Sequence, residues 1–123
     1  MKLIAYARVS TGGQRDGLAV QEQTIREWAA RERHTIVPNG DGICHVEKKS
    51  GKRIENRPVL LRVLERFGAG EADGLVVSKL DRLARSTIDT LQIVERTERK
   101  NWRLFALDMP ETTGAEGEFF ITI

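Results

Sequence analysis

The chain has few cysteines and histidines, the residue types that form disulfides and many metal sites. Its 123 residues include one cysteine, Cys44, and only two histidines. A single cysteine cannot form an internal disulfide, which favours a reducing compartment, the cytoplasm. Neither His34 nor His45 has an acidic or cysteine partner at metal-ligand spacing, so the sequence predicts no metal site. No cofactor is expected.

Long hydrophobic runs and a large excess of one charge are also missing. No apolar stretch approaches the roughly 20 residues that cross a bilayer, and Arg8 interrupts the apolar start too early for a signal peptide. The sequence therefore predicts no membrane partner. The formal net charge is only +2, so the chain lacks the strong positive field of a dedicated DNA-binding module. Its 20 basic residues are 14 Arg and 6 Lys, a balance that favours specific phosphate pairing.

Short apolar segments alternate with segments of helical periodicity, such as Leu18, Ile25, Trp28 and Ala29. The alternation indicates βαβ units, hence an α/β fold with a three-layer open, mostly parallel sheet flanked by helices. The length fits one domain. Strands are expected at 3–9, 35–37, 74–78 and 103–107, helices at 18–33, from Pro58 to about 67 and after Ser86, and an irregular loop at 41–56.

Two polar strings each follow an apolar run that predicts a buried strand. They are YARVST at 6–11 and KLDRLARS at 79–86. In an open parallel sheet, reactive groups gather beyond the carboxyl ends of the strands, so the two strings could face each other across one crevice. Guanidinium groups around a hydroxyl suggest a phosphorus centre, because Arg pairs bidentately with phosphate oxygens and keeps its charge. The groups concerned are Arg8, Ser10, Asp81, Arg82 and Arg85.

Both strings, in this order and spacing, resemble the catalytic domain of serine recombinases, the resolvase and invertase family. YARVST resembles the segment of the nucleophile, and KLDRLARS the second active-site segment. Between them, Ser50-Gly51-Lys52 and Asn56-Arg57-Pro58 resemble the "SGK … RP" region of the large serine integrases and transposases. GGQRDGLAVQEQ at 12–23 is similar to the integrase form as well. The likeness covers nearly the whole chain.

The resemblance implies cleavage and rejoining of double-stranded DNA. The Ser10 oxygen would attack a phosphodiester in line, forming a 5′-phosphoserine link and releasing a 3′ hydroxyl. The covalent link conserves the bond energy, so rejoining needs no ATP. Preorganised cations stabilise the charge that spreads over the phosphate oxygens in the transition state. The match to the family pattern assigns this role to Arg8, Arg57, Arg82 and Arg85.

Asp81 has two interpretations. It could orient an arginine, or donate a proton to the 3′ leaving oxygen. Neighbouring arginines should lower the pKa of its carboxyl group, which favours the orienting role. The resemblance further implies substrate-binding roles for Gln14, Gln21, Ser50 and Lys79.

The end of the chain is expected to be incomplete. Residues 117–123 begin an apolar segment without a polar finish, which we interpret as a helix cut at its first turn. By resemblance, residues 1–123 are then an N-terminal catalytic domain truncated at the start of a long dimerisation helix. The full-length protein would be a homodimer or tetramer, cytoplasmic and encoded by a bacterium or phage, and an accessory directionality factor is a further partner that the family allows.

Two other interpretations remain open. One is a catalytically inactive regulatory or oligomerisation module of the same fold. The other is a small α/β protein that binds phosphate or a nucleotide. Thr11-Gly12-Gly13-Gln14 is not followed by the Lys-Ser/Thr pair of an NTPase loop, which counts against the second of these.

Overall fold

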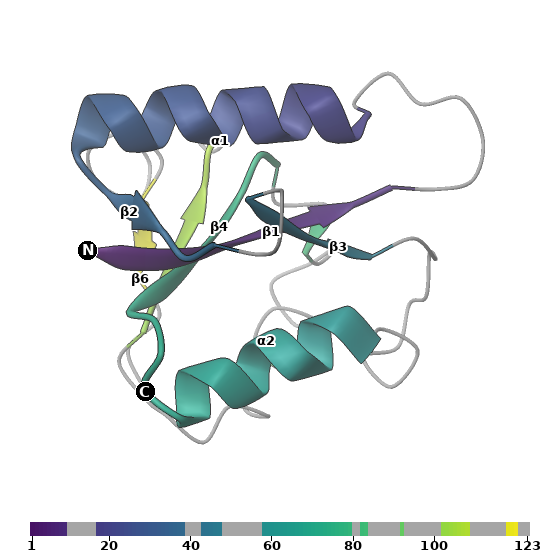
Figure 1. The fold of residues 1–123 in the computed structure, drawn as a ribbon, viewed down its shortest axis with the longest axis vertical. Helices are drawn as coiled ribbons and strands as arrows, with labels where there is room; N and C mark the ends of the chain where they lie inside the picture. Colours follow the sequence, from purple (N-terminus) through teal and green to yellow (C-terminus); the bar gives the residue numbers. More distant parts are fainter. Residues whose placement is uncertain are drawn as a thin grey trace.

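Strands and helices alternate along the described part of the chain (Figure 1). The structure is a computed structural model, and it describes residues 1–9, 17–38, 43–47, 58–79, 82–83, 92, 102–108 and 118–120. The strands are β1 (Lys2–Arg8), β2 (Thr35–Ile36), β3 (Cys44–Glu47), β4 (Gly74–Val77), β5 (Arg103–Ala106) and β6 (Glu118–Phe120). The helices are α1 (Leu18–Glu32) and α2 (Pro58–Gly68).

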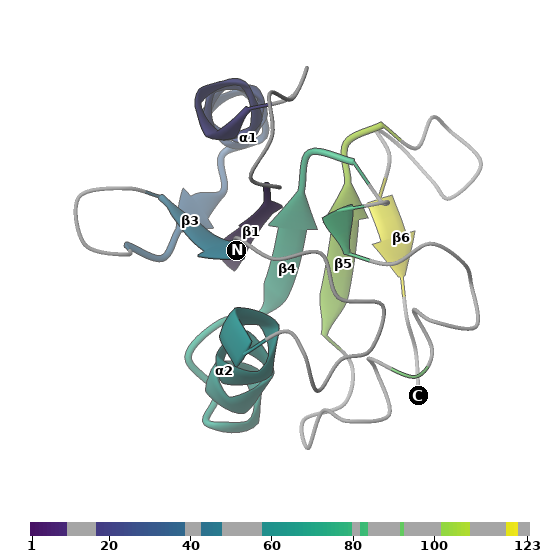
Figure 2. The ribbon, with the colours of Figure 1, turned by 90° about the vertical axis from the view of Figure 1, so that its right-hand side faces the viewer.

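One sheet forms the middle layer, with the order β2-β1-β4-β5-β6, and β3 also pairs with β1. β1 runs parallel to β2, β3 and β4, and β4 runs parallel to β5. Among the described strands, only β6 is antiparallel to its neighbour. Figure 2 shows α1 on one face of the sheet and α2 on the other. The expected three-layer open α/β sheet flanked by helices is confirmed.

β1 supplies side chains to both faces of the sheet because successive strand residues point to opposite sides. Leu3, Ala5 and Ala7 belong to the core on the α1 side, and Ile4 and Tyr6 to the core on the α2 side. All five are fully buried. A strand covered on both faces is a continuous apolar run, which explains why this segment shows no polar alternation.

α2 presents one apolar face to the sheet, as its sequence predicts. Its buried residues recur at the spacing of a helix face, and Phe67 stacks on Trp102 with ring centroids 4.9 Å apart. Pro58 occupies the first helical position, where the missing N–H costs nothing. The buried residues of α2 are Leu60, Val63, Leu64 and Phe67.

Within the described segments, no helix has the length and apolar character to cross a membrane.

The prediction of an irregular loop over 41–56 is wrong for Cys44–Glu47, which form β3. β2 pairs only with Lys2 and Leu3, so the rest of that edge of β1 would otherwise lack a partner. β3 takes this place, from Ala5 opposite Cys44 to Arg8 opposite Glu47. Four residues between polar segments show no clear period, and their strand conformation depends on pairing with the distant β1. The rest of 41–56 lies outside the described residues.

The prediction of a helix over 117–123 is wrong for Glu118–Phe120, which form β6. These residues pair with β5, from Arg103 opposite Phe120 to Phe105 opposite Glu118. The pairing satisfies the edge of β5, and phenylalanine is a good strand former. The helix predicted after Ser86 lies outside the described residues, apart from Gln92, which is helical.

Gly74 marks a close approach between β4 and β5. A Cβ atom there would lie 2.6 Å from the Arg103 carbonyl oxygen and 3.0 Å from Leu3 Cδ2. Since the first obstacle is backbone, it cannot move aside without shifting β5. We expect Gly74→Ala to lower the free energy of unfolding toward the upper end of the about 1–3 kcal/mol that is typical of overpacking. Urea unfolding followed by circular dichroism measures the change.

Gly17→Ala is the control for Gly74→Ala. The Cβ position at Gly17 is open, and its φ of −63° suits any residue. Its loss of stability should stay below about 1 kcal/mol, as for an altered N-cap. Equal losses in the two variants would contradict the steric explanation.

Candidate active site

The carboxyl ends of β1, β3 and β4 lie at one edge of the sheet, on the right in Figure 1. The chain passes from β1 through α1 to β2 on one side of β1, and from β3 through α2 to β4 on the other. Such a reversal opens a crevice beyond the strand ends, where ligands of open α/β sheets bind. The amino-terminal ends of α1 and α2 lie at the same edge. The topology therefore brings candidate residues from separate segments to the region beyond the carboxyl ends of the adjacent strands β1 and β4.

Arg8 and Lys79 occupy corresponding positions beside this crevice. The strand register pairs Ala5 with Val76. Arg8 and Lys79 each lie three residues farther along their own segment, so they occupy matching positions. Neighbouring strands are about 4.8 Å apart, so both cations belong to the same edge. Arg82 follows through a turn in which its N–H donates to the Lys79 carbonyl oxygen at 3.0 Å. Arg82 is half-buried, and its Nε atom is inaccessible to solvent.

Gln21 fixes the main chain of Arg8. It lies in the first turn of α1, is fully buried, and donates from Nε2 to the Arg8 carbonyl oxygen at 3.3 Å. The sequence resemblance implies a substrate-binding role for Gln21, and that role stays a prediction. The hydrogen bond from its side chain fixes the main chain of Arg8, the last residue of β1. This bond joins α1 to β1 at the edge of the crevice.

Glu47 is the residue at this edge that the sequence analysis did not single out. It ends β3, pairs with Arg8 in the strand register, and is only 3% exposed. Its Oε1 accepts hydrogen bonds from the Leu60 N–H at 3.1 Å and the Tyr6 hydroxyl at 3.4 Å. Its Oε2 accepts from the Val59 N–H at 3.4 Å. A carboxylate at this place satisfies unpaired helix N–H groups and is favoured by the helix dipole.

The sequence signal for Glu47 is weak. One acidic residue ahead of Lys48 and Lys49, in a segment that predicts a loop, is ordinarily a solvated charge. Only the pairing of β3 with β1 buries it. One pattern would have pointed to Glu47. It is an acidic residue that ends a short apolar segment and precedes, by about ten residues, a helix that starts with proline.

The remaining candidates lie outside the described residues, and their assignments stay predictions. The same holds for the two interpretations of the aspartate in KLDRLARS. Within the described part, no cluster of His, Cys, Asp and Glu could hold a metal ion. The undescribed candidates are Ser10, Gln14, Ser50, Arg57, Asp81 and Arg85.

Cys44 is a core residue of β3, facing α1. Burial raises the pKa of its thiol to about 12, with a further increase from the charge of Glu22 and a smaller opposing effect from Arg26. A thiol with this pKa is protonated at neutral pH, and the thiolate is the nucleophilic form. Cys44 is therefore not a candidate nucleophile.

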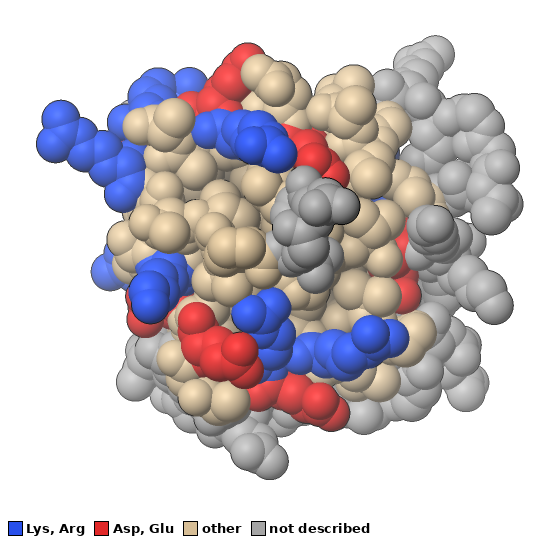
Figure 3. Space-filling view, viewed as in Figure 1, with Lys and Arg blue, Asp and Glu red and all other residues tan. Residues whose placement is uncertain are grey.

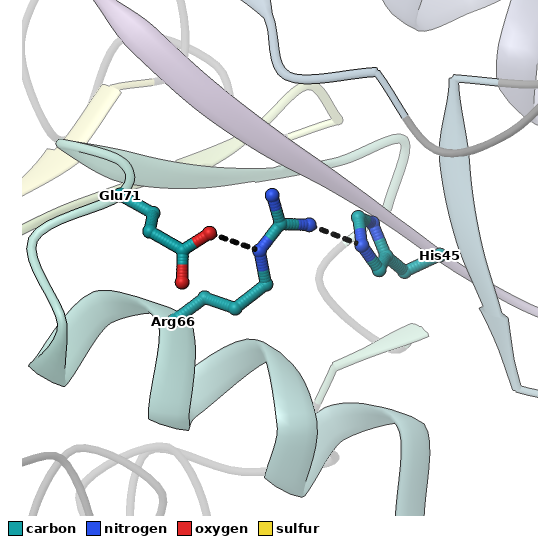
Figure 4. A network of polar contacts seen from close by, with 3 residues as sticks. All are labelled: His45, Arg66 and Glu71. Atoms are coloured by element: carbon teal, nitrogen blue, oxygen red, sulfur yellow. Dashed lines mark hydrogen bonds and ion pairs between the residues drawn. The ribbon is translucent and has the colours of Figure 1, made fainter.

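His45 belongs to a polar network on the α2 side of the sheet (Figure 4). Arg66 donates from Nη1 to His45 Nε2 at 2.7 Å, and its Nε pairs with Glu71 Oε1 at 3.2 Å. Because arginine has no acceptor, Nε2 must accept, and the imidazole is neutral. Burial of the ring, followed by the charge of Arg66, lowers the pKa of His45 from its ordinary value of 6.5.

We expect the folded chain to lose stability as pH falls below 6.5, the ordinary pKa of histidine. Between that value and the lowered pKa of the native state, the unfolded chain binds more protons at His45, so stability rises with pH. Thermal unfolding midpoints between about pH 7.5 and about pH 5 cover the range in which histidine charge changes. His45→Gln should give a shallower dependence, since His34 is common to both proteins. An unchanged slope would contradict the assignment.

Comparison with known proteins agrees with this architecture. The family model described as "Resolvase, N terminal domain" matches residues 3–123. The integrase-like protein y4lS of Sinorhizobium fredii is 36% identical over 121 residues, covering 98% of this chain and 58% of that protein. The serine recombinase gin of Escherichia phage Mu is 34% identical over 122 residues, covering 98% of this chain and 55% of that protein. The chain thus spans little more than half the length of these curated relatives.

A solved structure has the same fold. The N-terminal catalytic domain of TP901-1 integrase superposes with a TM-score of 0.71 at 24% sequence identity, over 95% of this chain and 86% of that one. Since the family model matches almost the whole chain and the fold agrees, the chain belongs to the resolvase N-terminal domain family.

Proposed function

We propose that this chain is the catalytic domain of a serine site-specific recombinase that cuts and rejoins double-stranded DNA. One observation carries the proposal: in a chain of this family, Arg8 ends β1, and Lys79, whose carbonyl oxygen accepts from the Arg82 N–H, follows the end of the neighbouring parallel strand β4. Relatives named as a serine recombinase and an integrase-like protein support the reaction class. The inactive module of the same fold is the alternative that an activity measurement must exclude.

Ser10 is the proposed nucleophile, two residues after Arg8 in the sequence. Its Oγ forms a bond to the scissile phosphorus while the bond from phosphorus to the 3′ oxygen breaks. The hydroxyl proton of Ser10 passes to a base, and the 3′ oxygen takes up a proton as it leaves. The 5′ end stays joined to Ser10 as a phosphodiester. Attack by the 3′ hydroxyl of a new partner strand reverses these steps, so the bond count is conserved and no ATP is consumed.

The arginines are proposed to stabilise the charge that develops on the non-bridging phosphate oxygens. Arg8 and Arg82 are the two whose placement at the crevice supports this role, and Arg57 and Arg85 join them by match to the family. Asp81 is proposed to orient one of these guanidinium groups. The proposed contacts to the DNA come from Gln14, Gln21, Ser50 and Lys79, and Gln21 also supports the Arg8 main chain.

The intact protein is proposed to act on DNA as a homodimer or tetramer in the cytoplasm of a bacterium, with residues 1–123 as its N-terminal catalytic domain. We further propose the large integrase or transposase type, on the strength of the "SGK … RP" region, and no metal or cofactor. In the view of Figure 3, Lys and Arg are interspersed with Asp and Glu and form no continuous basic surface. The formal net charge of only +2 supports assigning the charge-driven affinity for DNA to other parts of the intact protein. An accessory directionality factor is a further proposed partner.

A covalent trap tests the proposal. The intact protein is incubated with labelled duplex fragments from the DNA that flanks its own gene, and the mixture is then denatured in SDS. We expect a protein–DNA linkage that survives SDS, and mass spectrometry of the digested complex should find the nucleotide on Ser10. A linkage on another residue would refute the assignment, and no linkage to a fragment that the protein binds specifically would favour the inactive module.

A further inference from the structure

We infer that Lys79 is the general acid that protonates the 3′ oxygen as it leaves the scissile phosphorus. The inference rests on the proposed function, because it names the proton donor of the cleavage step. An N–H bond of the ammonium group breaks while an O–H bond forms on the 3′ oxygen, which leaves a neutral amine. In rejoining, the amine takes a proton from the attacking 3′ hydroxyl. Each cycle of cleavage and rejoining therefore returns Lys79 to its ammonium form.

Lys79 lies at the edge of the crevice beside a second cation. It follows the end of β4 by two residues, and the strand register gives it a position that matches that of Arg8 on the neighbouring β1. Neighbouring strands are about 4.8 Å apart. A phosphodiester held by the Arg8 guanidinium group would therefore lie within reach of the Lys79 ammonium group, which a flexible four-carbon stem carries.

The main chain on both sides of Lys79 is fixed. Before it, the Val77 carbonyl oxygen accepts from the Leu107 N–H at 3.1 Å. After it, the Arg82 N–H donates to the Lys79 carbonyl oxygen at 3.0 Å, and Leu83 is fully buried in the core on the α2 side. A general acid must come within about 2.6–3.2 Å of the atom that it protonates, so a fixed main chain suits this role.

Lysine differs from the neighbouring arginines in the proton that it can release. The guanidinium groups of Arg8 and Arg82 stay protonated in proteins, so they stabilise charge but do not transfer a proton. A lysine ammonium group carries three protons, and lysine is among the side chains that act as general acids. The arginines are thus suited to the non-bridging oxygens, and Lys79 to the bridging 3′ oxygen.

The side chains of β1 and β3 near the crevice that could carry a transferable proton are engaged elsewhere. Tyr6 is fully buried, and its hydroxyl donates to Glu47, which is itself 3% exposed and accepts two main-chain N–H groups of α2. Cys44 is buried in the core that faces α1, and the His45 ring accepts from an arginine of α2. Lys79 is only half-buried, so part of its surface is open to a substrate.

A duplex with sulfur in place of the 3′ bridging oxygen tests the inference in the intact protein. Thiols are far stronger acids than alcohols, with a pKa of about 8.5 for cysteine, so a thiolate leaves without being protonated. The substituted bond is the one that the covalent trap maps. The rate of linkage to Ser10 is measured in a single turnover at saturating protein.

Lys79→Met removes the ammonium group, and Lys79→Arg keeps the charge without a transferable proton. On the ordinary duplex, both should form the linkage about 10²- to 10⁴-fold more slowly than the wild type, the range typical of a lost general acid. On the sulfur duplex, both should approach the wild-type rate for that duplex. Equal losses on the two duplexes would overturn the inference, and so would a wild-type rate for either variant on the ordinary duplex.

Three further variants show whether rescue by sulfur is specific. Arg82→Lys should be equally slow on both duplexes, because Arg82 is assigned to the non-bridging oxygens, and its full rescue would refute the assignment of Lys79. Lys2→Met removes an exposed lysine at the opposite end of β1 and should match the wild type on both duplexes. Rescue of Asp81→Asn without rescue of the Lys79 variants would make Asp81 the acid and overturn the inference.

The outcomes distinguish this inference from the function on which it rests. If the wild-type protein forms no linkage on Ser10 with either duplex, the proposed function fails and the role of Lys79 fails with it. If the wild-type protein forms the linkage and sulfur does not restore the Lys79 variants, only the role of Lys79 as the acid fails.

Discussion

Replacing Ser10 with alanine in the intact protein should abolish strand cleavage while leaving DNA binding largely unchanged. The substitution removes the only atom proposed to form a bond to phosphorus, and alanine offers no substitute nucleophile. The arginines that would hold the phosphate remain, so affinity has no reason to fall. Gel shifts measure binding, and SDS-resistant linkage on the same labelled fragments measures cleavage.

Thr24→Ala is the matched control for the loss of a hydroxyl. Thr24 is exposed on α1, where its Oγ1 donates to the Val20 carbonyl oxygen at 2.9 Å, and it should cleave at the wild-type rate. Cleavage by Ser10→Ala above background, with the DNA trapped on another residue, would show that the nucleophile has been misassigned.

The second large effect is expected for Arg82→Lys, which retains the charge and removes the planar fork. Arg82 is half-buried, and its main-chain N–H donates to the carbonyl oxygen of Lys79, which lies two residues after the end of β4. An ammonium group is a point charge without bidentate geometry. Losing one donor to the transition state typically costs about 2.7–4 kcal/mol, or roughly 10²- to 10³-fold in rate. Single-turnover linkage on saturating protein measures the loss.

Arg31→Lys provides the comparison for this variant. Arg31 lies near the end of α1, its side chain is 65% exposed, and it pairs only with Glu32 among the described residues. Exposed pairs contribute about 0–1 kcal/mol, so its cleavage rate should match that of the wild type. If Arg82→Lys also cleaves at the wild-type rate, the geometric role of the guanidinium group is wrong, and charge alone would suffice.

The fold class and the family could be read from local features of the sequence. The apolar run Leu3–Ala7 is continuous because β1 is covered on both faces, and α2 carries its apolar residues at helix spacing. The string at 6–11, within which β1 ends, and the string at 79–86, which follows β4, could be placed at strand ends for the same reason. Each of these features can be recognised in a single sequence because it depends on residues that are close together in the chain, through periodicity, turn chemistry or a contiguous motif.

Tertiary structure alone decided the elements whose conformation depends on distant pairing. β3 and β6 are short strands that form because β1 and β5 have open edges, and nothing in their own periodicity demands it. The same pairing buries Glu47 and brings it to the start of α2, 12 and 13 residues away in sequence. A hydrogen bond across that separation has no local signature, because its free energy is gained only once the sheet has formed.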